Sequence, residues 1–341
     1  MVPNALVLLL LASVLTYPLG GDAGPIARRM LAKEKMTAWI DVCVTYDRRY
    51  TEINPYFSTP NIFREYLQAF VKAVELRFRD LENTEVLLST ARIEELKWIL
   101  PIIEGGSSSK YVESDKTIQK LTETRERNQD YYMGCDVLLF ITGYHLDTHL
   151  IKEDKTWHGL PQQGSVCQSG SVAFIHDNGR SFSGVNFFAQ QLAFLLNASL
   201  QTSSGYFKSL MSQPDISFMY NVHLKGRAAI RTLLETRTED PQNNNECWRD
   251  VPFSLLYPLP VDYLGTMSSP CSLYSLQECN EQQRRSFMNN QGLPEPPCKH
   301  ICCSRRRPEP VNWPDGKHCG VSSVCVSGWC VNMATGEVMQ P

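Results

Sequence analysis

The sequence lacks a large net charge and, beyond its N-terminus, lacks any long hydrophobic run. It contains 33 Lys and Arg against 36 Asp and Glu, which gives a formal net charge of −3. A balance this close to neutral argues against a protein that coats nucleic acid or an acidic membrane. No later stretch approaches the roughly 18 consecutive apolar residues of a membrane-spanning helix, so no membrane span is expected in the mature chain.

Cysteine is scarce in the first two thirds of the chain and abundant at its end. Of the 12 cysteines, nine lie from Cys247 to Cys330 and only three precede them. Disulfides at this density are typical of small domains that cannot build a sufficient hydrophobic core. Together with the length of 341 residues, this distribution predicts a larger core-stabilised domain followed by a smaller disulfide-rich one.

The N-terminus has the pattern of a secretory signal peptide. Residues 5–15 are apolar except for Ser13, and Gly20, Gly21 and Ala23 follow where a signal peptidase would cut. We therefore expect a signal peptide over residues 1–23 and a secreted, extracellular protein, whose disulfides would persist. An uncleaved anchor is the alternative, because no Lys or Arg precedes the apolar run.

Hydrophobic periodicity predicts alternating strands and helices. Thr59 and Pro60 supply an N-cap and a first-turn proline for one of the helices. The expected strands span residues 37–46, 85–92, 135–142 and 171–176, the helices 60–81, 115–130 and 185–196, a loop 104–110 and a linker 236–246. This order predicts an α/β fold with a mainly parallel sheet flanked by helices.

A search for catalytic or ligand-binding patterns finds no complete one. The chain has no nucleophile elbow, no glycine-rich phosphate loop and no Cys-x-x-Cys pair, and the adjacent Cys302 and Cys303 suit a disulfide cluster better than zinc. His145 and His149 are four apart, a spacing that would place two metal ligands on one helix face. They follow a predicted strand and Gly143, however, so a solvated loop is the preferred interpretation.

Five segments in order resemble the reprolysin-like (adamalysin/ADAM-type) metzincin metalloproteases, and most of all the salivary metalloproteases of blood-feeding ticks. The segments are GCDVLLFITGY at 134–144, GSVC at 164–167, FSGV at 182–185, DISFMY at 215–220, and PDGKHCG at 314–320 with Cys325 and Cys330. Met219 would belong to the family's Met-turn. The resemblance implies a metalloprotease-like domain over residues 36–250, with a mixed sheet and flanking helices, and a cysteine-rich domain over 251–341.

The chain departs from this family at the zinc helix. The family motif H-E-x-x-H-x-x-G-x-x-H binds Zn²⁺ through three histidines, and its glutamate activates the bound water. The matching positions are Gln190, Gln191, Phe194 and Leu200. Phe and Leu have no donor atom, and an amide is neither a good zinc ligand nor a base. No H-E-x-x-H occurs anywhere in the chain, so the resemblance implies a lost metal, no other cofactor and an inactive enzyme.

The motif's glycine is replaced by Asn197, the next most tolerant residue for the left-handed conformation that the helix end requires. Asn197-Ala198-Ser199 is also a glycosylation sequon. We expect a glycosylation site at Asn197, with a sterically closed, unmodified helix end as the alternative.

The resemblance also bears on the substrate edge, the propeptide and the disulfides. In the family, the strand before Gly164 is an edge strand that pairs with the substrate backbone. In this chain that segment contains Pro161, which lacks one of the backbone donors such pairing uses. About a dozen residues separate the expected cleavage site from Lys35, too few for the usual inhibitory propeptide. A truncated or misassembled reading frame is the alternative explanation. The family pattern implies a Cys167–Cys247 disulfide. The pair Cys43–Cys135 would then remain, with eight cysteines from residue 271 to 330 paired among themselves.

Three functions from different classes follow. The preferred one is a secreted, inactive metalloprotease homologue that binds host extracellular or plasma proteins, for example those of haemostasis or the matrix. The alternative is an active secreted metalloendopeptidase with an unrecognised site. An integrin-binding module is less favoured, because the chain has no Arg-Gly-Asp and its Lys225-Gly226-Arg227 is an ordinary tripeptide.

Overall fold

The computed structural model describes residues 36–97, 102–104, 110–146, 159–199, 224–238, 258–265, 269–291, 296–304 and 307–339. The expected signal peptide and the 250/251 domain boundary therefore lie outside the described residues. Below, the sheet region means the described part of residues 36–199, and the cysteine-rich region means the described part of residues 258–339. No helix in the described ranges is long and apolar enough to cross a membrane.

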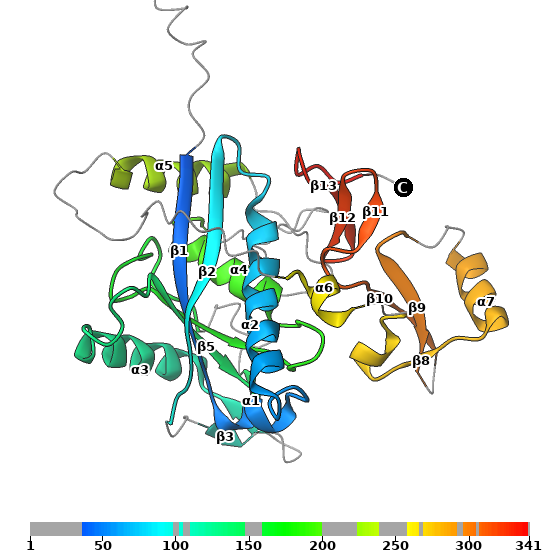
Figure 1. The fold of residues 1–341 in the computed structure, drawn as a ribbon, viewed down its shortest axis with the longest axis horizontal. Helices are drawn as coiled ribbons and strands as arrows, with labels where there is room; N and C mark the ends of the chain where they lie inside the picture. The colour runs from blue at the N-terminus through cyan, green and yellow to red at the C-terminus, as the bar shows by residue number, and fades with distance from the viewer. Residues whose placement is uncertain are drawn as a thin grey trace, which may run out of the picture. The chain divides into compact units, whose positions relative to one another are not determined.

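A four-stranded parallel sheet forms the centre of the sheet region (Figure 1). Its strands, in the spatial order β2-β1-β5-β7, are β2 (Thr84–Glu95), β1 (Met36–Tyr46), β5 (Val137–Thr142) and β7 (Val172–His176). All three neighbouring pairs are parallel. The predicted α/β class and all four predicted strands are thus confirmed.

Side chains of the buried strands alternate between two hydrophobic clusters. In β5, Val137, Leu139 and Ile141 belong to one cluster, whereas Leu138 and Phe140 belong to the other. Alternation of this kind follows from the two-residue period of a strand, and it shows that both faces of the sheet are covered.

Helices cover the two faces separately. Helices α2 (Pro60–Glu75) and α4 (Val185–Leu195) contribute to the first cluster, and α3 (Ser114–Arg127) contributes to the second. A short helix, α1 (Arg48–Ile53), follows β1. Pro60 opens α2 as predicted, but the Thr59 side chain makes no capping hydrogen bond. The predicted helix 60–81 stops at Glu75, where the chain tightens into a 3₁₀ turn, Leu76–Phe78.

Several elements were absent from the sequence prediction. Strands β3 (Ile102–Glu104), β4 (Lys110–Val112) and β6 (His145–Leu146) make a small separate sheet around the predicted loop. Helix α5 (Leu224–Thr238) enters the predicted linker, so that linker is wrong at its first residues. Ile230 and Leu234 lie four apart and are both buried, and this spacing was the available signal for α5.

The cysteine-rich region consists of short elements. They are α6 (Pro260–Leu264), a 3₁₀ turn (Cys271–Tyr274), β8 (Gln277–Glu278), α7 (Glu281–Gln291), β9 (Lys299–Cys303), β10 (Pro308–Asn312), β11 (His318–Gly320), β12 (Ser323–Val326) and β13 (Trp329–Asn332). The strands form two antiparallel sheets, β10-β9-β8 and β11-β12-β13.

Disulfides join these short elements to one another. The pairs are Cys271–Cys302, Cys279–Cys303, Cys298–Cys325 and Cys319–Cys330, so the eight late cysteines pair among themselves as predicted. The predicted Cys43–Cys135 disulfide is also present. Cys167 is disulfide-bonded, and its expected partner, Cys247, lies outside the described residues.

A buried arginine joins the two regions. Arg77, in the 3₁₀ turn after α2, is 3% exposed and forms an ion pair with Asp315. It also donates to Asn186 at the start of α4 (3.1 Å) and to Ser327 (2.8 Å). Nearby, Leu76 packs with three valines of the second small sheet, Val324, Val326 and Val331. The cysteine-rich region is therefore docked on the sheet region by apolar and charged contacts.

Candidate functional site

The candidate site is helix α4, where the resemblance places the zinc ligands. The helix follows β7 through the segment 177–184, and most of its side chains are buried. Gly184 precedes the helix, and a Cβ atom there would come within 2.7 Å of the carbonyl oxygen of His176. Only glycine therefore lets the helix start this close to the end of β7.

One buried carboxylate, Asp177, organises the segment before α4. It is 0% exposed and accepts hydrogen bonds from two tyrosine hydroxyls, one serine hydroxyl and two backbone N–H groups. The donors, at 2.8–3.1 Å, are Tyr50, Tyr66, Ser183, Gly179 and Gly184. Burial, followed by the Asp177 charge, holds the pKa of both tyrosines well above the usual value. Both phenols thus stay protonated and remain donors, and the loop is tied to α1 and α2.

Gln191, where the resemblance would place a general base, bonds to β7 of the sheet. Its Oε1 accepts from the N–H of Phe174 (2.8 Å), and its Nε2 donates to the carbonyl of Phe174 (2.7 Å). Among the described strands β7 lies at the edge of the sheet, and this amide satisfies backbone groups that a further strand would otherwise pair. Residues 159–163, where the family's edge strand was expected, form no strand, in keeping with Pro161.

Two further positions that the resemblance assigns to zinc ligands, Gln190 and Phe194, also face the protein interior. Gln190 is 4% exposed, and Phe194 is half-buried and packs against the larger hydrophobic cluster. Leu200 and Met219 lie outside the described residues. Among the described positions of the motif, the side chains offer no imidazole, carboxylate or thiol to a metal.

The end of α4 has the predicted turn. Asn197 has φ +76°, the left-handed conformation expected of it. The N–H groups of Gly164 and Val166 donate to the carbonyls of Phe194 and Leu195, at 3.1 and 3.2 Å, and thereby cap the helix. Asn197 is half-buried and Ser199 is exposed, while glycosylation itself remains a prediction.

Two described clusters have the geometry of metal ligands: Cys298, Cys319 and Cys330, and Cys271 with Glu278 and His300. All four cysteines are in disulfides. A disulfide sulfur is not the thiolate that binds a metal, so neither cluster is a metal centre in the oxidised protein.

His145, expected in a solvated loop, is exposed but lies on β6. His149 lies outside the described residues.

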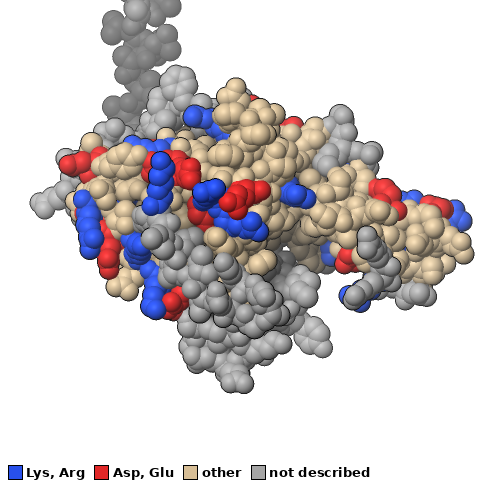
Figure 2. Space-filling view, turned by 90° about the horizontal axis from the view of Figure 1, so that it is seen from below, with Lys and Arg blue, Asp and Glu red and all other residues tan. Residues whose placement is uncertain are grey.

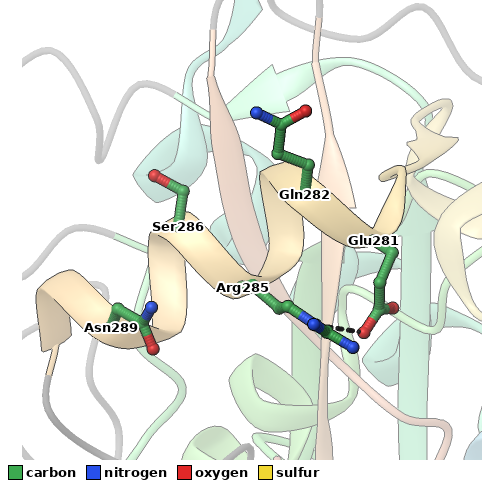
Figure 3. Close-up of a pocket in the computed structure, with 5 residues that line it drawn as sticks. All are labelled: Glu281, Gln282, Arg285, Ser286 and Asn289. Carbon is green, nitrogen blue, oxygen red and sulfur yellow. Dashed lines mark hydrogen bonds and ion pairs between the residues drawn. The ribbon is translucent and has the colours of Figure 1, made fainter.

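A polar groove of about 630 Å³ runs along α7 in the cysteine-rich region. Its lining residues come from one face of the helix (Figure 3): Glu281, Gln282, Arg285, Ser286 and Asn289. Glu281 forms ion pairs with Arg284 and Arg285, which lower its pKa. The groove offers amide, hydroxyl and guanidinium groups to a ligand, and no nucleophile paired with a base.

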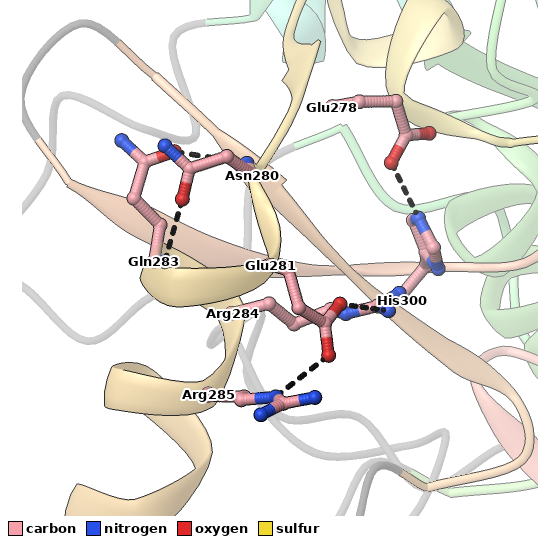
Figure 4. Close-up of polar contacts among 7 residues, drawn as sticks. All are labelled: Glu278, Asn280, Glu281, Gln283, Arg284, Arg285 and His300. Atoms are coloured by element: carbon pink, nitrogen blue, oxygen red, sulfur yellow. Dashed lines mark hydrogen bonds and ion pairs between the residues drawn. The ribbon is translucent and has the colours of Figure 1, made fainter.

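The start of α7 is capped by its own residues, and the sheet beside it carries a histidine–carboxylate pair. Asn280 and Gln283 cap the helix reciprocally, and His300 of β9 pairs with Glu278 of β8 at 3.0 Å (Figure 4). Elsewhere, acidic and basic side chains are interspersed on the face shown in Figure 2. A smaller pocket near α5 contains Arg227 and Arg231, but both are paired with carboxylates, at 2.6 and 2.9 Å.

Comparisons with known proteins add little. No family model matches the chain, and no curated protein matches it significantly. A chain in a solved structure described as a chaperone–substrate complex has 10% sequence identity and a TM-score of 0.39 to this one, over 59% of this chain and 34% of that one. A similarity of this size supports no inference about fold family or function.

Proposed function

We propose that the protein is a secreted, catalytically inactive homologue of a reprolysin-like zinc metalloendopeptidase, and that it acts by binding host proteins of haemostasis or the extracellular matrix. The observation that carries this proposal is the pairing of Gln191 with Phe174. The side chain in the general-base position has a structural partner on each amide atom, and an amide cannot accept a proton from water at neutral pH.

The surrounding positions agree with an inactive site. Phe194 packs against the core where a histidine would bind zinc, and Gln190 is buried. An apolar, closely packed environment disfavours a divalent cation, because little compensates the cost of removing its water. The ordered motifs and the preserved turn at Asn197 support descent from the metalloprotease scaffold, as distinct from its chemistry.

Inactivity can be tested on the secreted, disulfide-intact protein. We expect no hydrolysis of denatured gelatin or casein, with or without added Zn²⁺. Hydrolysis that a chelator abolishes would overturn the proposal and favour the alternative of an active metalloendopeptidase.

The binding function can be tested at the α7 groove. We expect the protein to bind at least one component of a panel of plasma and matrix proteins, and a double variant, Arg285→Ala with Asn289→Ala, to weaken that binding about tenfold or more. The matched control is Glu123→Ala with Arg127→Ala, an exposed pair on α3. Equal binding by both variants would remove the groove from the proposal, and no binding to any component would contradict the function.

A further inference from the structure

Two histidines far apart in the sequence lie side by side at the end of the parallel sheet. His176 is the last residue of β7, and His145 lies on β6. Their ring centroids are 4.9 Å apart and the rings are inclined by 39°. The small sheet β3-β4-β6 positions His145, because Tyr111 of β4 pairs with it in register.

The two imidazoles differ in exposure. His145 is exposed, whereas His176 is half-buried, and its Nδ1 is buried and makes no hydrogen bond of normal geometry. Burial lowers the pKa of His176, and His145 lowers it further, against opposing effects of Asp177 and the backbone of Tyr144 and Thr142. At neutral pH the ring is therefore neutral, which is the form that binds metals.

The two neighbouring carboxylates, Asp177 and Asp47, direct their hydrogen bonds to other groups. Asp177 directs both oxygens at the five donors described above, and Asp47 accepts from Tyr50, Thr142 and Gly143. Among the described residues, no other charged group interacts with the His176 ring. The arrangement is thus two adjacent imidazoles, one on β6 and one on β7. Neither is paired with a carboxylate as in a catalytic dyad.

We propose that His145 and His176 form a two-imidazole site for a borderline divalent transition metal, namely Zn²⁺, Cu²⁺ or Ni²⁺, with water completing the coordination. Imidazole is the protein ligand that these ions share, and affinity for it follows the order Ni²⁺ < Cu²⁺ > Zn²⁺. The site is separate from α4 and goes beyond the proposed function.

Calorimetric titration of the chelator-treated protein with Cu²⁺, Ni²⁺ and Zn²⁺ tests the site. At about pH 7.5 we expect one ion per chain, bound most tightly for Cu²⁺, and at about pH 5.5 we expect binding to be lost as protons compete for the imidazoles. The His145→Asn variant should bind at least about tenfold more weakly. Because His145 is exposed, this variant should keep the wild-type fold, which circular dichroism checks.

The matched control is His318→Asn, which changes an exposed histidine on β11 and should leave binding unchanged. Absence of binding by the wild type, or equal binding by His145→Asn, overturns the inference. Zinc retained by His145→Asn together with chelator-sensitive hydrolysis would instead contradict the proposed inactivity. Metal lost in that variant without any hydrolysis supports the histidine site and leaves the proposed function intact.

Discussion

The sheet region and the cysteine-rich region are each stabilised by a different kind of interaction. The sheet region buries two hydrophobic clusters on opposite faces of its strands and contains one disulfide between described residues, Cys43–Cys135. The cysteine-rich region contains four disulfides, and two of its small clusters consist largely of cysteines. Burial grows with the size of a folded unit, so short strands that cannot bury enough apolar area depend on covalent links.

The largest expected effect separates the two regions directly. Reduction of the disulfides should unfold residues 269–339, because each disulfide of this kind contributes about 2–4 kcal/mol. The sheet region should stay folded on its hydrophobic clusters. Hydrogen exchange followed by mass spectrometry would show protection lost in the cysteine-rich region and kept in β1, β5 and β7. Simultaneous loss in both regions would contradict the comparison.

Within the sheet region, the buried carboxylate should matter most. Replacing Asp177 with Asn leaves several of its five donors without an acceptor, and breaking a buried charged network costs about 3–5 kcal/mol. Urea denaturation would measure the free energy of unfolding. The control is Asp130→Asn, an exposed position where we expect almost no change; equal effects at the two sites would refute the role given to Asp177.

The joint between the regions is tested at Arg77. Arg77→Ala leaves Asp315 buried without its partner and should cost about 3 kcal/mol. The cysteine-rich region should then separate from the sheet region and give a second transition in calorimetry. Arg79→Ala, at an exposed neighbour, should keep a single transition. A single unchanged transition in Arg77→Ala would show that the apolar contacts of Leu76 are enough to keep the two regions together.

A substitution at Gln191 tests whether this residue has a structural role or a catalytic one. In Gln191→Glu the carboxylate cannot donate to the carbonyl of Phe174, so we expect a loss of about 2 kcal/mol and no gain of hydrolysis. Gln168→Glu makes the same charge change at an exposed site and should be neutral. Hydrolysis by Gln191→Glu in the presence of Zn²⁺ would contradict the assignment of this position to structure.

The smallest effect is a dependence of stability on pH. The folded-state pKa of His176 lies below its ordinary value of 6.5, so below that value the unfolded chain binds the proton more readily than the folded chain. Stability should therefore fall as the pH drops through about 6.5 and level off below the folded-state pKa. In His176→Asn this part of the denaturation profile should become flatter, whereas His318→Asn should keep it. An unchanged slope in His176→Asn would assign the dependence to other groups.

Local pattern predicted much of the fold. The continuous apolar run in Val137–Thr142 was sufficient to predict β5. The helical spacing of apolar residues after Pro60 was sufficient to predict α2, because the helix buries one face with its own period. The left-handed turn at Asn197 and the self-contained pairing of the late cysteines were also predicted. Helix α5 was missed, although Ile230 and Leu234 have helical spacing, because its other residues are mostly polar.

The polar centres could not be predicted in the same way. Asp177 directly follows a strand and precedes Asn178-Gly179, which marks a turn, but its tyrosine donors lie 111 and 127 residues away. Arg77 and Asp315 are 238 residues apart. A hydrogen bond across such distances has no periodic signature, because it depends on where packed elements bring the side chains.

The sequence by itself determined the α/β class, the two-part cysteine distribution and the residue types of α4, which include no histidine, carboxylate or thiol. Tertiary structure alone decided which partners the polar residues have: Gln191 bonded to the edge of β7, Asp177 holding the segment before the helix, and His145 beside His176. The reason is physical. Residue type limits which bonds a side chain can form, and long-range packing selects the partner with which it forms them.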